Sequence, residues 1–266
     1  MNWFDSHCHL KTFWDRGELA SVMDRAQNAS VTGMITVGTS PKDWNIYSHL
    51  AIEYQEMVYY SIGLHPGYVD DFWEQNTRGL RKYWDNKKPP VALGEIGLDY
   101  FMLPSEEVKR TRIINHQKAA FFKQLQWAKQ LDCPVIVHSR NAFEDCVGLI
   151  DESGLNWNSV VFHCFSEGQD QAKVLLERGG LASFTGIITF KNNESLRDVL
   201  RSYPLQKLML ETDSPYLAPV PKRGKQNEPS YLSYIGEYLA DRFKICPNAL
   251  AEKTNRATRE FFRLPA

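Results

Sequence analysis

The sequence has no long apolar run and almost no net charge. No apolar run approaches the ~20 residues that a membrane-spanning helix needs, so a transmembrane protein is not expected. The 31 basic and 32 acidic residues leave a net charge of −1, which gives no electrostatic footprint for nucleic acid or membrane. This balance does not exclude a polyanionic substrate, because bound divalent cations would add positive charge locally.

Cysteine is scarce, and its spacing gives no disulfide framework. The five cysteines are odd in number and never form Cys-x-x-Cys, which favours a reducing compartment. The first residues show no basic segment followed by an apolar one, so no signal peptide is predicted. We therefore expect a cytoplasmic protein that has no membrane partner.

The sequence also lacks a linker, a repeat and a low-complexity segment, so a single domain over residues 1–266 is expected. Eight short apolar runs alternate with longer amphipathic stretches along it. The runs cover residues 3–6, 33–37, 58–62, 91–94, 135–137, 160–162, 181–184 and 208–210. The expected helices cover residues 18–28, 44–55, 78–86, 106–130, 142–151, 169–178, 194–203, 231–243 and 248–262.

This alternation predicts an α/β fold with a parallel sheet. Eight β-then-α units can close into a (β/α)8 TIM barrel, and 266 residues suit one such barrel. The runs are nearly continuous in apolar character, as strands covered on both faces should be. A doubly wound open sheet is the alternative. The absence of Gly-x-Gly-x-x-Gly after the first run weighs against the dinucleotide-binding form of that fold.

His7 and His9 stand at the end of the first expected strand. Residues two apart on a strand point to the same face, so both imidazoles should aim at one point. Asp5 shares that face. Its carboxylate is expected to accept a proton from the second ring nitrogen of a histidine whose first ring nitrogen acts as a ligand. By itself His-x-His is a weak signal that chance can produce.

Other side chains of the metal-ligand type follow further strands. Because the carboxyl ends of barrel strands meet at one face, these residues are expected to form one pocket. They are His65, Glu95, His138, His163 and Asp213, which leaves only His49 and His116 among the histidines inside expected helices. Taken singly, His163 could be a core histidine, and Glu95 or Asp213 could cap a helix.

Together these residues give a metal-binding set that suits Zn²⁺, Mn²⁺ or Mg²⁺ better than Ca²⁺. One open tetrahedral site cannot use so many ligands. Two divalent ions that share one carboxylate account for the whole set. It comprises His7, His9, Glu95, His138, His163 and Asp213.

The motifs resemble those of the TatD family of metal-dependent deoxyribonucleases, over essentially the whole chain. They are Asp-Ser-His-Cys-His at 5–9, Gly-Glu-Ile-Gly-Leu-Asp-Tyr at 94–100, His-Ser-Arg at 138–140, His-Cys-Phe-Ser at 163–166, Glu-Thr-Asp-Ser-Pro-Tyr-Leu at 211–217 and Arg-Gly-Lys-Gln-Asn-Glu-Pro at 223–229. The family belongs to a superfamily of metal-dependent hydrolases built on (β/α)8 barrels, so the resemblance implies the same fold here.

The resemblance also implies roles for the ligand set. One ion would be held by His7, His9, Glu95 and Asp213, and a second by Glu95, His138 and His163, so that Glu95 bridges the two. The implied reaction is metal-dependent hydrolysis of phosphodiester bonds from a DNA end, of the 3′–5′ exonuclease type, with a water activated by both ions. Asp213 would accept the proton of that water, or would serve only as a ligand.

The expected substrate is a short or single-stranded DNA end, bound by a monomeric enzyme. His65 matches a position near the phosphate and counts as catalytic with Glu95 and Asp213. Arg140 is expected to donate to phosphate oxygens too, although an ion pair with Asp99 or Glu144 is an equal alternative.

Two loop cations, Arg223 and Lys225, follow the eighth strand between prolines and are expected to grip the substrate. A solvated loop is the alternative for them. Trp73, Tyr100 or Tyr216 could stack an end base, and each could equally be packing.

Two other functions stay open on the sequence alone. The first is hydrolysis of a small amide, ester or nucleotide on the same barrel. Relatives of that kind often bridge their metals with a carboxylated lysine, whereas this chain has Glu95 at the fourth strand. The second is a catalytically inactive scaffold, which the intact ligand set disfavours.

Overall fold

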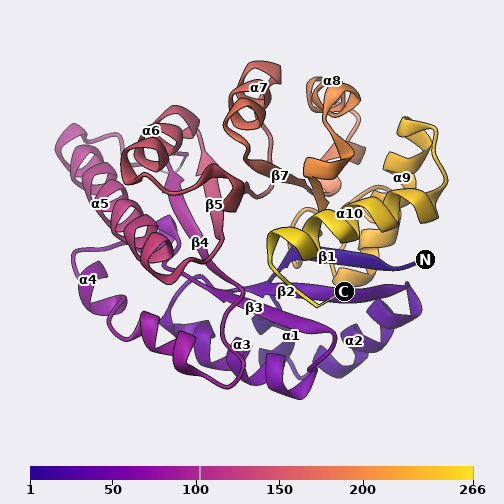
Figure 1. Cartoon of the computed structure of the whole chain (residues 1–266), viewed down its shortest axis with the longest axis horizontal. Helices are drawn as coiled ribbons and strands as arrows, with labels where there is room; N and C mark the ends of the chain where they lie inside the picture. The colour runs from indigo at the N-terminus through magenta and orange to yellow at the C-terminus, as the bar shows by residue number, and fades with distance from the viewer. Residues whose placement is uncertain (102, 266) are drawn as a thin grey trace.

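The computed structural model describes residues 1–101 and 103–265, and its centre is an eight-stranded parallel sheet in sequential order. Helices surround the strands on the outside (Figure 1). The predicted (β/α)8 barrel is confirmed. Its strands are β1 Trp3–Cys8, β2 Val31–Val37, β3 Val58–Ile62, β4 Ala92–Asp99, β5 Val135–Arg140, β6 Val160–Phe162, β7 Leu181–Phe184 and β8 Leu208–Leu210.

The barrel is nearly closed between its first and last strands. The Ser6 hydroxyl donates a hydrogen bond to the carbonyl of Leu210 at 3.0 Å. Just beyond β8, the N–H of Asp213 donates to the carbonyl of His7 at 2.9 Å. These bonds place the residues that follow β8 beside the end of β1.

The helices of the described residues alternate with the strands along the chain. The α-helices are α1 Lys11–Asp15, α2 Leu19–Asn28, α3 Pro41–Glu53, α4 Trp73–Asn76, α5 Glu107–Leu131, α6 Phe143–Ser153, α7 Gln169–Arg178, α8 Glu194–Ser202, α9 Leu232–Phe243 and α10 Pro247–Phe261. Short 3-10 helices are η1 Pro66–Tyr68, η2 Leu80–Asp85, η3 Trp157–Ser159, η4 Gly186–Thr189, η5 Leu205–Lys207 and η6 Pro229–Tyr231. None of the helices described has the length and apolar character needed to cross a membrane.

Three strands extend further at their carboxyl ends than the apolar runs predict. The expected strands at 3–6, 91–94 and 135–137 continue as β1, β4 and β5 through the polar residues at their ends. The pairing of β4 with β5 persists to Asp99 opposite Arg140. A run of apolar side chains ends at the first polar residue, but backbone pairing does not. Several candidate ligands therefore lie within strands and not after them.

One expected helix, at 78–86, is wrong in type. The structure has the 3-10 helix η2 there, preceded by the four-residue α4, which the sequence did not predict. Leu80 is buried and Tyr83 is half-buried, and their spacing of three residues puts them on one face of a 3-10 turn. The segment between β3 and β4 is therefore irregular, unlike the long helices elsewhere in the barrel.

The apolar core forms two layers. A large layer fills the space between the strands and the helices, and it includes Trp3, Trp44 and Phe121. A smaller layer lies inside the barrel, where residues such as Phe4, Ile35 and Met209 meet Phe261 and Phe262 from the end of α10. The barrel is thus closed by apolar side chains at one end, which leaves the carboxyl ends of the strands for polar groups.

Helix α9 approaches β1 so closely that only glycine fits at one position. A Cβ on Gly236 would lie 2.6 Å from Cζ2 of the buried Trp3 ring. Trp3 begins β1, which carries His7 and is followed directly by His9. We expect Gly236→Ala to lower the free energy of unfolding by about 1–3 kcal/mol through overpacking.

The matched control is Gly148→Ala, also inside a helix but with no atom within 4 Å of the added Cβ. It should raise the free energy of unfolding by about 0.4–1 kcal/mol, because alanine favours helices. Urea unfolding followed by circular dichroism measures both. Equal effects of the two substitutions would contradict this account of the α9–β1 contact.

Candidate metal centre

Glu95 on β4 lies at the centre of a cluster of histidines at the carboxyl ends of the strands. Its carboxylate is almost entirely buried, and Oε1 faces three imidazoles. His163 Nε2 lies 2.8 Å from Oε1, His138 Nδ1 lies 2.9 Å away and His65 Nε2 lies 3.3 Å away. These residues come from β5 and from the segments after β3 and β6, so the barrel brings together what the sequence separates.

The second oxygen of Glu95 faces a different group of ligands. Oε2 lies 3.5 Å from His7 Nε2 and 3.8 Å from His9 Nε2. The carboxylate of Asp213 approaches the same two rings, with Oδ1 at 3.6 Å from His7 Nε2 and 3.4 Å from His9 Nε2. One carboxylate thus separates two sets of side chains, each of the type that binds divalent metals.

Local backbone geometry holds these side chains in place. Gly97 on β4 has φ +143°, and a Cβ there would lie 2.9 Å from the carbonyl carbon of His138, so glycine lets β4 and β5 approach beside Glu95. Asp213 adopts φ +53° and Cys164 adopts φ +46°, which are uncommon for residues other than glycine. Such strain often lies at functional sites, where surrounding contacts enforce it.

Hydrogen bonds at the outer nitrogen fix the proton positions of two histidines. His9 Nδ1 lies 3.0 Å from the carbonyl of Val37, which can only accept, so the neutral ring carries its proton on Nδ1. His138 Nε2 lies 3.2 Å from Asp99 Oδ2 and likewise donates. Each ring therefore directs a lone pair from its other nitrogen into the cluster, as a metal ligand must.

The histidine nitrogens inside the cluster crowd one another. His7 Nε2 and His9 Nε2 are 3.2 Å apart, and His138 Nδ1 and His163 Nε2 are also 3.2 Å apart. Because the lone pairs of His9 and His138 point inward, these contacts bring nitrogen donors together in pairs. A cation between them would satisfy this arrangement, so the donor set fits divalent metal binding.

His65 differs from the other rings. Its Nδ1 accepts a hydrogen bond from the N–H of Gly67 at 2.9 Å, so the neutral ring carries its proton on Nε2. That N–H points toward Glu95 Oε1. The ring is thus arranged as a hydrogen-bond donor at the edge of the cluster, which suits the expected contact with a phosphate better than a metal bond.

The expected contact between Asp5 and a ligand's ring nitrogen is wrong. Asp5 is fully buried and accepts hydrogen bonds from the N–H and hydroxyl of Thr212, at 2.9 and 2.6 Å. Burial outweighs these bonds and raises the pKa of Asp5 to about 8. Alternation along β1 directs the carboxylate correctly toward the barrel end, but it could not reveal that Thr212 lies within reach.

The two carboxylates at the centre are stabilised as anions. Burial opposes the ionisation of Glu95, but the neighbouring histidines, His163 foremost, outweigh it and hold its pKa well below the usual range. Burial likewise opposes the ionisation of Asp213, but the neighbouring imidazoles of His9 and His7 outweigh it and lower its pKa. Anionic oxygens surrounded by imidazoles are what a divalent cation requires.

The cluster lies at the bottom of a cavity of about 790 Å³. His9, His65, Glu95, His138, His163 and Asp213 all line it, as do three basic residues. These three are Lys11 at the start of α1, Lys42 in the first turn of α3, and Arg140. Two of them, Lys11 and Lys42, were missed by the sequence analysis, because neither stands directly after a strand.

Arg140 does not form the ion pair that was its alternative role. Within residues 1–101 and 103–265 it pairs with neither Asp99 nor Glu144. Its guanidinium instead stacks on Phe101, 3.7 Å from the ring centroid, and remains exposed at the cavity wall. The arginine is therefore available to an anionic ligand.

The loop cations after β8 lie away from this wall. Arg223 stacks on the ring of Phe190 at 3.8 Å, and Lys225 is exposed. Neither belongs to the described lining of the cavity, to which the segment after β8 contributes Asp213, Tyr216 and Leu217. Their contact with a substrate stays a prediction.

Two acidic residues, Asp99 and Glu211, support the cluster, a role that the sequence did not predict for either. Asp99 orients His138, as described above. Glu211 is buried, accepts a hydrogen bond from the N–H of Cys164 at 2.6 Å, and lies 3.6 Å from His163 Nδ1. Both were visible as carboxylates near strand ends. Only the contacts in the folded structure distinguish these two supporting carboxylates from Glu95 and Asp213.

Comparison with known proteins gives a consistent family assignment. The model of the family described as TatD related DNase matches residues 4–263. An uncharacterized metal-dependent hydrolase, YcfH of Escherichia coli K12, is 35% identical over 266 residues, which cover 98% of this chain and 96% of that protein.

Two further similarities extend the comparison. A protein of Yersinia pseudotuberculosis named 3′-5′ ssDNA/RNA exonuclease TatD is 30% identical over 269 residues, covering 98% of this chain and 99% of that protein. The crystal structure of YjjV, a TatD homolog from Escherichia coli K12, superposes with a TM-score of 0.89 at 28% identity, covering 99% of this chain and 98% of that chain.

Proposed function

The chain belongs to the TatD related DNase family of metal-dependent hydrolases, and we propose that it is a two-metal exonuclease that shortens single-stranded DNA from its 3′ end. One relative is named as a 3′-5′ exonuclease on single-stranded DNA and RNA, which supports this choice of substrate and direction. The proposed enzyme is a monomer, since one barrel supplies the whole ligand set.

The observation that carries the proposal is the position of Glu95 between two sets of ligands. Oε2 faces His7 and His9, and Oε1 faces His138 and His163. We assign one divalent ion to the first pair together with Asp213, and a second ion to the other pair, with Glu95 shared. The ligand types allow Zn²⁺, Mn²⁺ or Mg²⁺.

A phosphodiester resists hydrolysis because it is anionic and has a poor leaving group. Two bound divalent ions would supply an activated water near neutral pH and would stabilise the charge that develops on the phosphoryl group. The chain itself must then position the phosphate, accept a proton and hold the neighbouring nucleotides.

Each of these tasks falls to a residue at the cavity wall. Asp213 is stabilised as a carboxylate, so it can accept the proton of the attacking water. His65 presents an N–H at Nε2 that can donate to a phosphate oxygen. Lys11, Lys42 and Arg140 surround the cavity and can neutralise the phosphates beside the scissile bond.

The test of the proposed function is hydrolysis of a single DNA strand labelled at either end. We expect the 5′-labelled strand to give a ladder that shortens from the 3′ end, with Mg²⁺, Mn²⁺ and Zn²⁺ compared. A circular single strand of the same sequence should resist cleavage, because it offers no end. Equal cleavage of circular and linear strands would overturn exonuclease action, and activity only on small esters or amides would favour the alternative hydrolase.

Glu95→Gln should weaken both ions together, because the amide keeps the shape of the side chain but loses its negative charge. We expect metal content to fall from two ions per chain, and turnover to fall by at least about 100-fold. Elemental analysis after equilibration with metal and gel filtration measures the first effect, and strand hydrolysis the second. Glu144→Gln, an exposed carboxylate on α6, is the control. Wild-type protein that retains one ion at most under metal excess would contradict the shared-ligand assignment.

Substituting the cations of the cavity and substituting the cations of the loop after β8 should have different effects on KM. Arg140→Ala combined with Lys42→Ala should raise KM for a single strand by about 30-fold or more, since each lost charge-assisted contact costs about 1 kcal/mol or more. Arg223→Ala combined with Lys225→Ala removes equal charge outside the described lining. If only the loop pair raises KM, the substrate enters over the loop after β8. If neither pair does, both assignments of phosphate contacts are wrong.

A further inference from the structure

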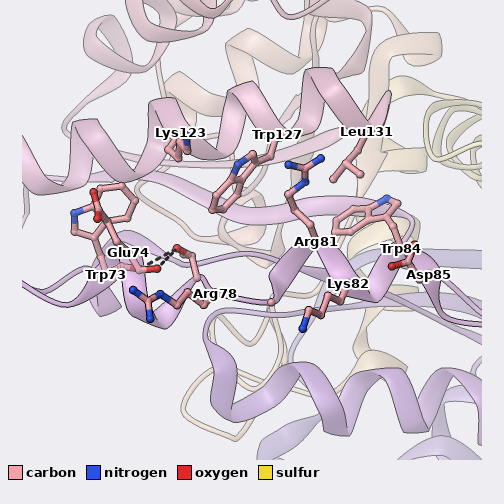
Figure 2. Close-up of a pocket in the computed structure, with 12 residues that line it drawn as sticks. Trp73, Glu74, Arg78, Arg81, Lys82, Trp84, Asp85, Lys123, Trp127 and Leu131 are labelled. Atoms are coloured by element: carbon pink, nitrogen blue, oxygen red, sulfur yellow. Dashed lines mark hydrogen bonds between the residues drawn. The ribbon is translucent and has the colours of Figure 1, made fainter.

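A basic hollow, separate from the catalytic cavity, lies on the outside of the barrel, between α5 and the segment that runs through α4 and η2 (Figure 2). Its volume is about 760 Å³, close to that of the catalytic cavity. We call it the tryptophan groove, because Trp73, Trp84 and Trp127 line it. None of the roles assigned so far uses this surface.

The charge of the groove is positive and uncompensated. Four exposed cations line it, against the two carboxylates of Glu74 and Asp85, which leaves a local charge of four minus two, or +2. The cations are Arg78, Arg81, Lys82 and Lys123. Within the described part of the chain none of them forms an ion pair. A neighbouring cation of α5, Lys118, does pair with a carboxylate, that of Asp145. Cations without partners are available to an external polyanion.

The aromatic side chains are arranged for stacking as well as packing. All three tryptophans are half-buried, so part of each indole remains open to the groove. Trp84 and Trp127 also pack against the core, whereas Trp73 belongs to neither described core cluster. Lys123 Nζ lies 5.9 Å from the ring centroid of Trp127. Open indoles beside cations are the combination that binds single-stranded nucleic acid, because unpaired bases expose their faces.

The groove is connected to the catalytic cavity through one short segment. Tyr68 lines the cavity and is 50% exposed, and Phe72 is 61% exposed. Trp73 follows at once and lines the groove. Trp73 follows Tyr68 by only five positions, which limits the distance between their Cα atoms to about 18 Å even for extended chain. Asp71 between them forms an ion pair with Arg112 of α5, and its Oδ1 lies 3.5 Å from Nδ1 of His116 on the same helix.

We propose that the tryptophan groove binds the single-stranded part of a nucleic acid substrate while its end lies in the catalytic cavity. This inference rests on the proposed function for the identity of the substrate. Bases stack on Trp73 and Trp127, and the cations of α5 and η2 neutralise the phosphates between them. Tyr68 and Phe72 form the path between groove and cavity. The groove therefore favours long single strands over duplexes and over short fragments.

The experiment measures binding without cleavage. A fluorescein-labelled polythymidine strand is titrated with protein in the presence of a chelator, and anisotropy is followed across salt concentrations. Arg78→Ala/Arg81→Ala/Lys123→Ala should weaken binding at least tenfold and make the slope of log K against log salt shallower by about 2, or 0.7 for each lost contact. The control Lys173→Ala/Arg242→Ala/Lys253→Ala removes equal charge from exposed positions on α7, α9 and α10 and should change affinity less than about twofold.

Separate substitutions test whether bases stack on Trp73. Trp73→Ala should weaken binding about tenfold, and Trp73→Phe should restore most of that loss, since phenylalanine keeps an aromatic face. Far-ultraviolet circular dichroism and thermal unfolding check that each variant folds. If the folded Trp73→Ala binds the strand as the wild type does, or if both charge variants weaken binding equally, the groove does not hold the strand.

Other partners give distinct results. A duplex that binds as tightly as the single strand, with the same sensitivity to Trp73→Ala, would overturn the assignment to unpaired bases. Polyglutamate that competes equally well with the strand would indicate a surface for acidic proteins and overturn the assignment to nucleic acid.

The experiments distinguish an error in the proposed role of the groove from an error in the proposed catalytic function. If wild-type protein binds the strand through the groove but never cleaves it, the proposed catalytic function is wrong and the proposed role of the groove in binding is supported. Suppose instead that it cleaves single strands, and that the groove substitutions leave the ratio of KM for a long strand to KM for a trinucleotide unchanged. The proposed role of the groove is then wrong, and the proposed catalytic function is not affected.

Discussion

The architecture of the site depends on one buried carboxylate in contact with several imidazoles. Burial would normally force Glu95 to hold a proton, but the surrounding rings compensate the charge. That compensation works only if β1, β4, β5 and the ends of β3 and β6 stay in register, because the rings approach the two oxygens from four different strands. The requirement explains the tight packing of β4 on β5 at Gly97 and the bond from Asp213 to His7 across the last gap of the barrel.

Much of this was visible in the sequence. The eight apolar runs predicted the barrel, because their spacing indicates that buried strands alternate with covering helices. The predicted ligand set followed from the positions of six residues after those runs, namely His7, His9, Glu95, His138, His163 and Asp213. Such reasoning needs only local patterns and one rule of topology, namely that the carboxyl ends of barrel strands converge.

Other features lie beyond local patterns. The partner of Asp5 is Thr212, about 200 residues away, and no periodicity within β1 can report it. Lys11 and Lys42 reach the cavity from helices, so the rule about strand ends misses them. The segment between β3 and β4 looked helical because its apolar residues recur at close spacing, but spacings of three and four are hard to separate in a short stretch. That irregular segment shapes the tryptophan groove.

The closure of the barrel by α10 has a consequence for how the protein is made. Phe261 and Phe262 fill the interior beside Phe4, so the inner core joins residues separated by nearly the whole described chain. During synthesis the early strands emerge without the partners that cover them, and they must wait for the last helix before the interior is dry. Asp213 also arrives late, long after His7 and His9. A nascent chain that has not yet exposed residue 213 therefore carries an incomplete set of the predicted ligands.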